Sequence, residues 1–216
     1  MATRKPQKKI AAAPTTELWQ TPDERARDRE KKRYAVILTA ARCFRERGYH
    51  NTSIDDVARI LNVTKPTIYH YVENKEQLLF ECFRTGLNQI MEAFEEIKGS
   101  QANALERLTM VMRRYAEAIA SDFGWCMVQA ENQDLSAAMS KKVRALKSEI
   151  DQGIRRLIKE GALDGSIRKC DAKITAFALA GAMNWIAYWY RPGGSLTPSQ
   201  IAERFLELFR LGLEQR

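Results

Sequence analysis

The chain has 216 residues, 45% of them hydrophobic, which is enough for one large domain or two small ones. A formal net charge of +8 favours a polyanion or an acidic ligand as partner. Four widely spaced cysteines without a CxxC pair, and only two histidines, argue against both a disulfide framework and a zinc site.

The first 28 residues predict a flexible basic arm. They mix three prolines with many charges and show no sustained periodicity. The arm can add contacts to DNA phosphates or remain a solvated tail, and the sequence leaves both open. It lacks the apolar segment of a signal peptide, and the longest apolar run, Ala176 to Tyr190, is shorter than the roughly 20 residues that span a bilayer. We therefore expect a cytoplasmic protein without a membrane partner.

Residues 29–80 predict a small domain of short helices. A first helix from about Arg29 ends where Gly48 can serve as its C-cap. Ser53 and Asp56 have the spacing of a capping box, which predicts that a second helix begins near Ile54. This helix is followed by a tight break before the next one.

The break and the next helix have the form of a helix-turn-helix. Asn62 tolerates a left-handed conformation, and we expect Val63 to be buried in the corner. Thr64 is predicted to cap a short third helix with Pro66 in its first turn. Ile68 and Val72 would then point inward. The outward residues of this helix would be Lys65, Pro66, Thr67, Tyr69 and His70.

The rest of the chain, 81–216, predicts an all-α second domain. Asn74 and Gln77 indicate the start of a longer helix that continues to about Lys98 and joins the two domains. Thr197 and Gln200 predict a reciprocal cap for the final helix. The other expected helices span 101–121, 123–132, 135–160, 170–190 and 198–214.

The helix near 170–190 is apolar nearly all round, so it must be covered on more than one side. The domain core can cover one side and a second copy of the same surface the other. We therefore expect a homodimer formed through the last two helices.

Over about residues 32–80 the chain resembles the TetR family of bacterial transcriptional regulators. The resemblance is carried by three motifs, G-Y-x-x-T-S, I-x-D-V-A and V-T-K-P-T-I-Y-H-Y-V-x-N-K-E-x-L. It implies a homodimeric repressor that binds a palindromic double-stranded operator and is released by a small-molecule effector, without a cofactor and without enzyme activity. The W-I-A-Y-W-Y-R-P-G-G stretch from Trp185 is similar to a subgroup that responds to acyl-coenzyme A thioesters in lipid or aromatic-acid catabolism.

The resemblance also implies roles for single residues. Lys65, Pro66, Thr67, Tyr69 and His70 match groove-facing positions. Lys65 can donate to guanine, and Thr67 and Tyr69 offer apolar and hydroxyl contacts. The positions that match phosphate contacts are Thr52, Tyr71 and Lys75. Tyr71 can equally be a core aromatic residue, and Lys75 a plain surface charge.

An effector requires a mostly apolar cavity in the second domain. The residues expected to contact it are Tyr115, Trp125, Met127, Met183, Asn184, Trp185 and Tyr188. Further candidates are Met110, Met112 and Phe123, with Arg113, Arg114 and Arg191 for anionic groups. Methionine and aromatic residues at helical spacing are also typical of a core, so this alternative stands beside the first.

Two other functions are consistent with parts of the sequence. An enzyme is disfavoured because nucleophile elbow, phosphate-binding loop and HExxH motifs are absent, and the acidic pair Glu131 and Asp134 is typical of a solvated loop. A helical architectural protein that binds DNA without a controlling ligand is the second alternative. The sequence does not identify the operator, the regulated genes or the effector.

Overall fold

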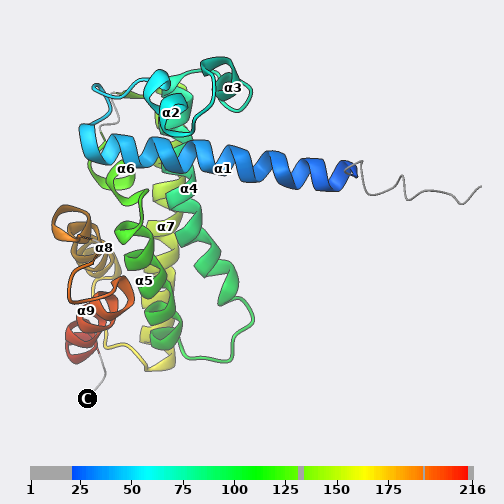
Figure 1. Ribbon diagram of the computed structural model, residues 1–216. Coiled ribbons are helices and arrows are strands. Elements are labelled where there is room, and N and C mark those ends of the chain that lie inside the picture. Colours follow the sequence, from blue (N-terminus) through cyan, green and yellow to red (C-terminus); the bar gives the residue numbers. More distant parts are fainter. Residues whose placement is uncertain (1–20, 131–133, 192, 214–216) are drawn as a thin grey trace, which may run out of the picture. The chain divides into compact units, whose positions relative to one another are not determined.

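The computed structural model describes residues 21–130, 134–191 and 193–213, and within them it contains helices and no β-strand. This confirms the predicted all-α fold class. The helices are α1 (Pro22–Arg47), α2 (Ile54–Ile60), α3 (Lys65–Tyr69), α4 (Lys75–Glu96), α5 (Ala104–Ala120), α6 (Gly124–Val128), α7 (Ala137–Asp164), α8 (Ala172–Trp189) and α9 (Pro198–Leu213) (Figure 1).

The first helix begins earlier than the sequence pattern suggested. Residues 22–28, predicted as part of a flexible arm, belong to α1. The backbone N–H of Thr21 donates to Glu24 Oε2 at 2.7 Å, and the N–H of Glu24 donates back to Thr21 Oγ1 at 3.2 Å. This reciprocal contact, with Pro22 as the first helical residue, starts the helix before the apolar periodicity begins. The rest of the predicted arm, residues 1–20, lies outside the described residues.

Contacts divide the chain into two compact units, and the boundary in the sequence falls between Ala35 and Val36. The first unit contains the first half of α1, where Lys32 pairs with Asp28 at 2.7 Å. The second unit holds everything from Val36 onward, so the predicted domains 29–80 and 81–216 share one continuous core. They share it because α4 carries buried side chains along most of its length.

The turn between α2 and α3 follows the predicted backbone but not all of its predicted side chains. Asn62 has a positive φ of 54°, as expected. Val63 is 39% exposed, so its predicted burial is wrong, and Leu61 packs on the core instead. Thr64 occupies the N-cap position of α3 without a side-chain cap, because its hydroxyl pairs with that of Thr67 at 2.9 Å.

Most of the predicted caps are confirmed. Ser53 and Asp56 form the capping box of α2, with the Ser53 N–H donating to Asp56 Oδ2 at 2.9 Å. Asn74 Oδ1 accepts from the N–H of Gln77 at 2.8 Å and so caps α4. The reciprocal contact of Thr197 and Gln200 precedes α9, with distances of 2.9 and 3.3 Å.

The second unit is built around α4, α5 and α7, which pack against one another, while α8 and α9 pack on α5 (Figure 1). The short α6 crosses α4 at Gly86. A Cβ atom on Gly86 would lie 2.4 Å from Met127 Sδ and 3.0 Å from Phe123 Cβ, so only glycine fits here without displacing a neighbour. Helix α6 ends at Val128, earlier than the predicted 132, and the next side chain, Gln129, donates to the carbonyl of Ala187 at 3.0 Å.

Two predictions from composition can be compared with the structure. The four cysteines are free, and Cys43, Cys82 and Cys126 are buried, whereas Cys170 is partly exposed. Within residues 21–130, 134–191 and 193–213, no helix combines the length and apolarity needed to cross a membrane.

Candidate DNA-binding surface and effector cavity

Helix α3 and the turn after it divide their residues between the core and the outer surface as the sequence predicted. Ile68 of the helix and Val72 of the turn are buried, at 0% and 2% exposure. Lys65, Pro66, Tyr69 and His70 are exposed, and Thr67 is half-buried. The inward residues fix the helix on the core, and the outward residues form a continuous surface that we call the α3 face.

Lys65 on the α3 face is already paired. Its Nζ lies 2.7 Å from Asp55 Oδ2 of α2, and this hydrogen bond and charge raise the pKa of Lys65. Asp55 occupies one of the three donors of the Lys65 ammonium group, so a DNA group that binds Lys65 would approach the negative charge of Asp55. Helical spacing alone does not predict this contact, although the two residues lie on the helices that flank the turn.

The structure gives no support to the predicted contact of Thr52 with a DNA phosphate. Its side chain is buried at 2% exposure, and its single hydroxyl proton is shared between the carbonyl oxygens of Gly48 at 2.9 Å and Cys43 at 3.2 Å. Cys43 lies in the last turns of α1, and Gly48 follows directly after the helix. The Thr52 side chain therefore links the segment before α2 to the end of α1.

Tyr71 and Lys75 lie at the edge of the α3 face. Tyr71 is half-buried and packs against the core, which favours the alternative reading of this residue as a core aromatic. Lys75 Nζ lies 4.3 Å from the centroid of the Tyr49 ring and 3.4 Å from the carbonyl oxygen of His50. Partial burial lowers the pKa of Lys75. Lys75 is the first residue of α4, and these contacts hold its ammonium group beside Tyr49 and His50.

Four polar contacts join residues 42–76 to the segments between α5 and α7. Asp122, between α5 and α6, accepts from Arg42 at 2.8 Å and pairs with Arg45 at 2.7 Å. His50 Nε2 lies 3.0 Å from Asp134 Oδ1. Glu76 Oε1 accepts from the N–H of Ser136 at 2.7 Å, and the hydroxyl and N–H of Ser136 lower the pKa of Glu76. Sequence reasoning missed them because the partners lie far apart in the chain.

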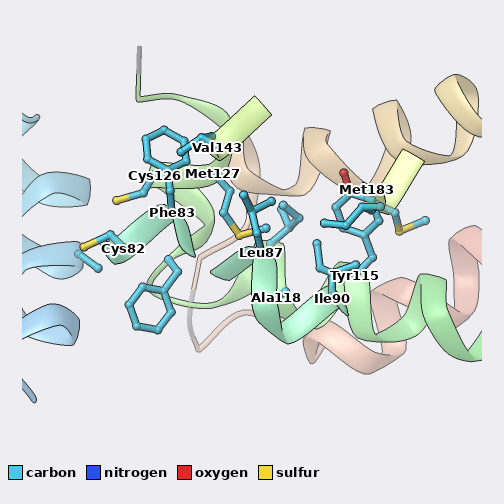
Figure 2. Packing of buried hydrophobic residues seen from close by; sticks show 14 of the residues in the cluster. Cys82, Phe83, Leu87, Ile90, Tyr115, Ala118, Cys126, Met127, Val143 and Met183 are labelled. Atoms are coloured by element: carbon cyan, nitrogen blue, oxygen red, sulfur yellow. The ribbon is translucent and has the colours of Figure 1, made fainter. Parts of the chain in front are cut away.

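A cavity of about 190 Å³ lies between α4, α5, α6, α7 and α8. Its lining residues are Leu87, Tyr115, Ile119, Met127, Lys147, Ile150, Asp151, Ile154, Phe177, Ala180 and Asn184. Figure 2 shows three of them, Leu87, Met127 and Tyr115, which come from three different helices. Three of the predicted effector contacts, Tyr115, Met127 and Asn184, line this cavity.

The polar part of this cavity contains a partly buried hydrogen bond. Tyr115 Oη donates to Asn184 Oδ1 at 3.1 Å, and burial raises the pKa of Tyr115 to about 12. Tyr115 is therefore neutral at physiological pH. Sequence reasoning missed Lys147 and Asp151, because charged residues on a long amphipathic helix give no signal of an inward position.

A second cavity of about 380 Å³ lies beside the first, and Ile119 lines both. It contains two further predicted residues, Trp125 and Tyr188, together with Arg191. The Arg191 guanidinium donates to the carbonyl of Tyr190 at 2.9 Å. Five of the seven predicted effector residues therefore line one or the other of these two neighbouring cavities.

Met183 and Trp185 line neither cavity, so the structure gives their predicted contact with an effector no support. Met183 is fully buried in the core, and Trp185 is 60% exposed on the opposite face of α8. Of the further candidates, Met112 and Phe123 are core residues, and Met110 and Arg113 line a groove beside α9. Arg114 pairs with Glu96 at 2.9 Å.

The outer surface of α8 is apolar. Exposed residues recur on it at helical spacing, at Ile174, Phe177, Trp185 and Tyr188. The rings of Trp185 and Tyr188 stack with centroids 5.0 Å apart. Gly181 lies between Phe177 and Trp185 along the helix, with open space where a Cβ atom would be. We call these five residues the α8 stripe.

The structure gives little support to a catalytic metal site or a carboxylate pair. In the part of the chain that the structure describes, no group of three or more His, Cys, Asp or Glu side chains is placed to hold a metal ion. Asp134 pairs with His50, and Glu131 lies outside the described residues.

Comparison with known proteins identifies the family. Residues 36–82 match a family model described as bacterial regulatory proteins of the tetR family. Residues 101–213 match one described as a tetracyclin repressor-like C-terminal domain. The first matched segment contains the α3 face, and the second contains most of the residues that line the two cavities.

Similar proteins include two curated regulators. The HTH-type transcriptional repressor KstR2 of Rhodococcus jostii is 27% identical over 84% of this chain and 91% of its own length. The fatty acid metabolism regulator protein of Bacillus subtilis is 24% identical over 87% and 98%.

Two solved structures are also similar. KstR2 of Mycobacterium tuberculosis, a ketosteroid transcriptional regulator, has a TM-score of 0.77 with 26% identity over 86% of this chain and 96% of its own. AibR in complex with isovaleryl coenzyme A and operator DNA has a TM-score of 0.70 with 30% identity over 82% and 96%. The chain belongs to the TetR family of bacterial regulatory proteins and is a DNA-binding transcriptional regulator.

Proposed function

We propose that the protein is a homodimeric repressor that binds a palindromic operator through the α3 face and leaves it when a short acyl-coenzyme A thioester fills the cavity beneath α4. The observation that carries this proposal is the position of Leu87. It lines the cavity and belongs to α4, the helix that begins directly after α3. A ligand in the cavity therefore contacts the helix that supports the DNA-binding surface.

The α3 face has the chemistry of a major-groove reader. Lys65 can donate to guanine O6 and N7, and the exposed Tyr69 ring can contact a thymine methyl group. Lys75, at the start of α4, is placed to contact a phosphate. A palindromic operator would have half-sites about 34 Å apart, one for each subunit.

The α8 stripe supports the homodimer. Exposed aromatic residues in one row are expensive to leave in water, and their burial against a second copy would remove this cost. Leu208 of α9, 68% exposed, adds to the apolar surface of the last two helices. A symmetric contact of this kind requires one surface that is complementary to itself, which is what a two-fold dimer uses.

The size of the cavity supports a short acyl group. A volume of about 190 Å³ lies below the roughly 300 Å³ at which pockets for larger ligands begin. The isovaleryl coenzyme A in the AibR complex is a ligand with a short branched acyl group. In the neighbouring cavity, Arg191 is our candidate partner for the phosphates of coenzyme A, and Trp125 and Tyr188 provide apolar contacts.

Release would proceed through α6 and α4. Met127 lines the cavity and lies against Gly86 at the crossing of the two helices. An acyl group that displaces Met127 would press on α4 and change the separation of the two α3 faces. Because a ligand shifts an equilibrium only by its differential affinity, the effector must bind the displaced state more tightly.

A gel-shift experiment with the DNA upstream of the protein's own gene tests this function. We expect a band that resists nonspecific competitor DNA, and that isovaleryl-coenzyme A weakens while coenzyme A alone does not. Tyr69→Ala should abolish the specific band. Glu92→Gln changes an exposed residue of α4 outside the α3 face and should retain the band. If nonspecific competitor DNA removes the band completely, the proposal that the protein binds this upstream DNA specifically is contradicted. A specific band that no acyl thioester weakens would contradict the effector alone.

A further inference from the structure

Lys147 is the unusual residue of the effector cavity. It lies on α7 and lines the cavity together with the buried side chains of Ile150 and Ile154. Its ammonium group sits 5.3 Å from the centroid of the Phe83 ring. Among the residues that the structure describes, it has no hydrogen-bond acceptor and no carboxylate partner. Lys147 is half-buried, and a partly desolvated cation without a counter-charge is costly, so this burial lowers the pKa of Lys147.

The one carboxylate of the cavity is already neutralised. Asp151 lies one helical turn from Lys147 and also lines the cavity. Both of its oxygens are bound by Arg155, with Nε at 3.1 Å from Oδ1 and Nη2 at 2.5 Å from Oδ2. The other polar groups, Tyr115 and Asn184, are neutral and bonded to each other. The cavity therefore contains one positive charge in excess.

We propose that Lys147 selects effectors whose short acyl chain carries a carboxylate at its far end. This inference rests on the proposed function and names the class of effector within it. A carboxylate would accept from the three donors of the ammonium group and supply the missing counter-charge. A single cation in a small cavity fits one carboxylate, whereas the phosphates of coenzyme A need more donors and more room.

A purely apolar acyl chain, such as that of isovaleryl-coenzyme A, should still bind, but more weakly. Such a chain would bury Lys147 further without pairing it, so the cost of desolvation would rise on binding. The preference should therefore combine attraction for the acidic effector with weaker binding of the neutral one.

The experiment compares two thioesters of equal carbon number, glutaryl-coenzyme A and valeryl-coenzyme A, by isothermal titration calorimetry. They differ in a terminal carboxylate against a methyl group. We expect the unmodified protein to bind glutaryl-coenzyme A about tenfold or more tightly, the range of a charged hydrogen bond. Lys147→Met keeps an unbranched side chain of similar length without the charge and should abolish this preference. The exposed Lys159 of the same helix gives a matched control, and Lys159→Met should leave the preference unchanged.

The outcomes separate this inference from the function on which it rests. Equal binding of the two thioesters by the unmodified protein would overturn the inference and leave the proposed function standing. Lys147→Met that weakens both thioesters equally would also overturn it, because Lys147 would then bind the coenzyme. If neither thioester binds nor releases operator DNA, both the effector class and this inference fail.

Two further arms complete the test. Free glutarate that binds as tightly as its thioester would support Lys147 as the carboxylate partner and identify the effector as a free dicarboxylate. The preference of the unmodified protein for glutaryl-coenzyme A over valeryl-coenzyme A tests the inference even if a Lys147 variant does not fold. Should Lys147→Met fail to fold, Lys147→Gln, which is polar but uncharged, provides the second variant and is expected to lose the same preference.

Discussion

Asp55 holds Lys65 at 2.7 Å, on the surface that we propose meets DNA. The pair is exposed, so water and salt screen it and its contribution to stability is small. We expect a larger effect on DNA binding, because DNA that approaches Lys65 also approaches the negative charge of Asp55. Asp55 should therefore oppose unspecific binding by the α3 face.

Substitution of Asp55 by asparagine should raise affinity for DNA. We expect the variant to bind the operator up to about fivefold more tightly, in keeping with the modest strength of exposed pairs. Affinity for unrelated DNA should rise as well, so specificity falls. Fluorescence anisotropy with operator and random duplexes measures both. The control is Glu92→Gln, which also removes one negative charge but lies outside the α3 face. An equal gain in DNA affinity in this control would assign the effect to net charge alone.

At the scale of elements, the short α2 depends on its capping box. The hydroxyl and N–H of Ser53, followed by Arg59, lower the pKa of Asp56 from its ordinary value of 3.8 to about 2. A carboxylate with a lowered pKa contributes stability above its ordinary pKa, and this contribution is lost as the pH falls through the lowered value. The helix-turn-helix should therefore weaken in acid.

The acid dependence can be assigned by substitution. Asp56→Asn should lower the melting temperature near neutral pH, because it removes the charged hydrogen bonds. The difference from the unmodified protein should shrink as the pH falls from about 4 toward 2, where Asp56 itself becomes protonated. Thermal melting monitored by circular dichroism at several pH values provides the measurement. A constant difference at every pH would show that the shape of the side chain matters and its charge does not.

The crossing of α4 and α6 is the second element-scale feature. Gly86 lies so close to Met127 that an added Cβ would stand 2.4 Å from Sδ. Gly86→Ala should force Met127 aside and destabilise the fold by about 1–3 kcal/mol, as overpacking does. In a Met127→Ala background the same change should cost less, because the space is then free. Urea unfolding of the four proteins measures this coupling, and strictly additive effects would argue against a tight crossing.

At the scale of the whole molecule, the α8 stripe decides how two subunits would meet. Trp185→Arg places a charge in the middle of the stripe and should convert the dimer into monomers, which light scattering detects as a halved mass. Operator affinity should fall strongly, since one α3 face alone reads half a site. Leu163→Arg is the control, because Leu163 is 88% exposed on α7 outside the stripe. A Trp185→Arg protein that keeps the mass of a dimer would contradict this interface.

The sequence by itself determined the local features of this protein. Capping pairs such as Ser53 with Asp56 act over three residues, and the inward side of α3 follows from helical spacing. The motifs around the turn were likewise local, and they led to the family that the comparisons confirm. Each of these signals is complete within one or two helical turns.

Only the tertiary structure decided what depends on partners far along the chain. The Thr52 hydroxyl is buried against the carbonyl of Gly48, and Trp185 lies on the opposite side of α8 from the buried Met183. Asp134 pairs with His50, and Lys147 lines one cavity with Asn184, although no sequence spacing relates these residues. Packing between helices sets these contacts, and a periodic pattern records which face of a helix is apolar but not which neighbour that face will meet.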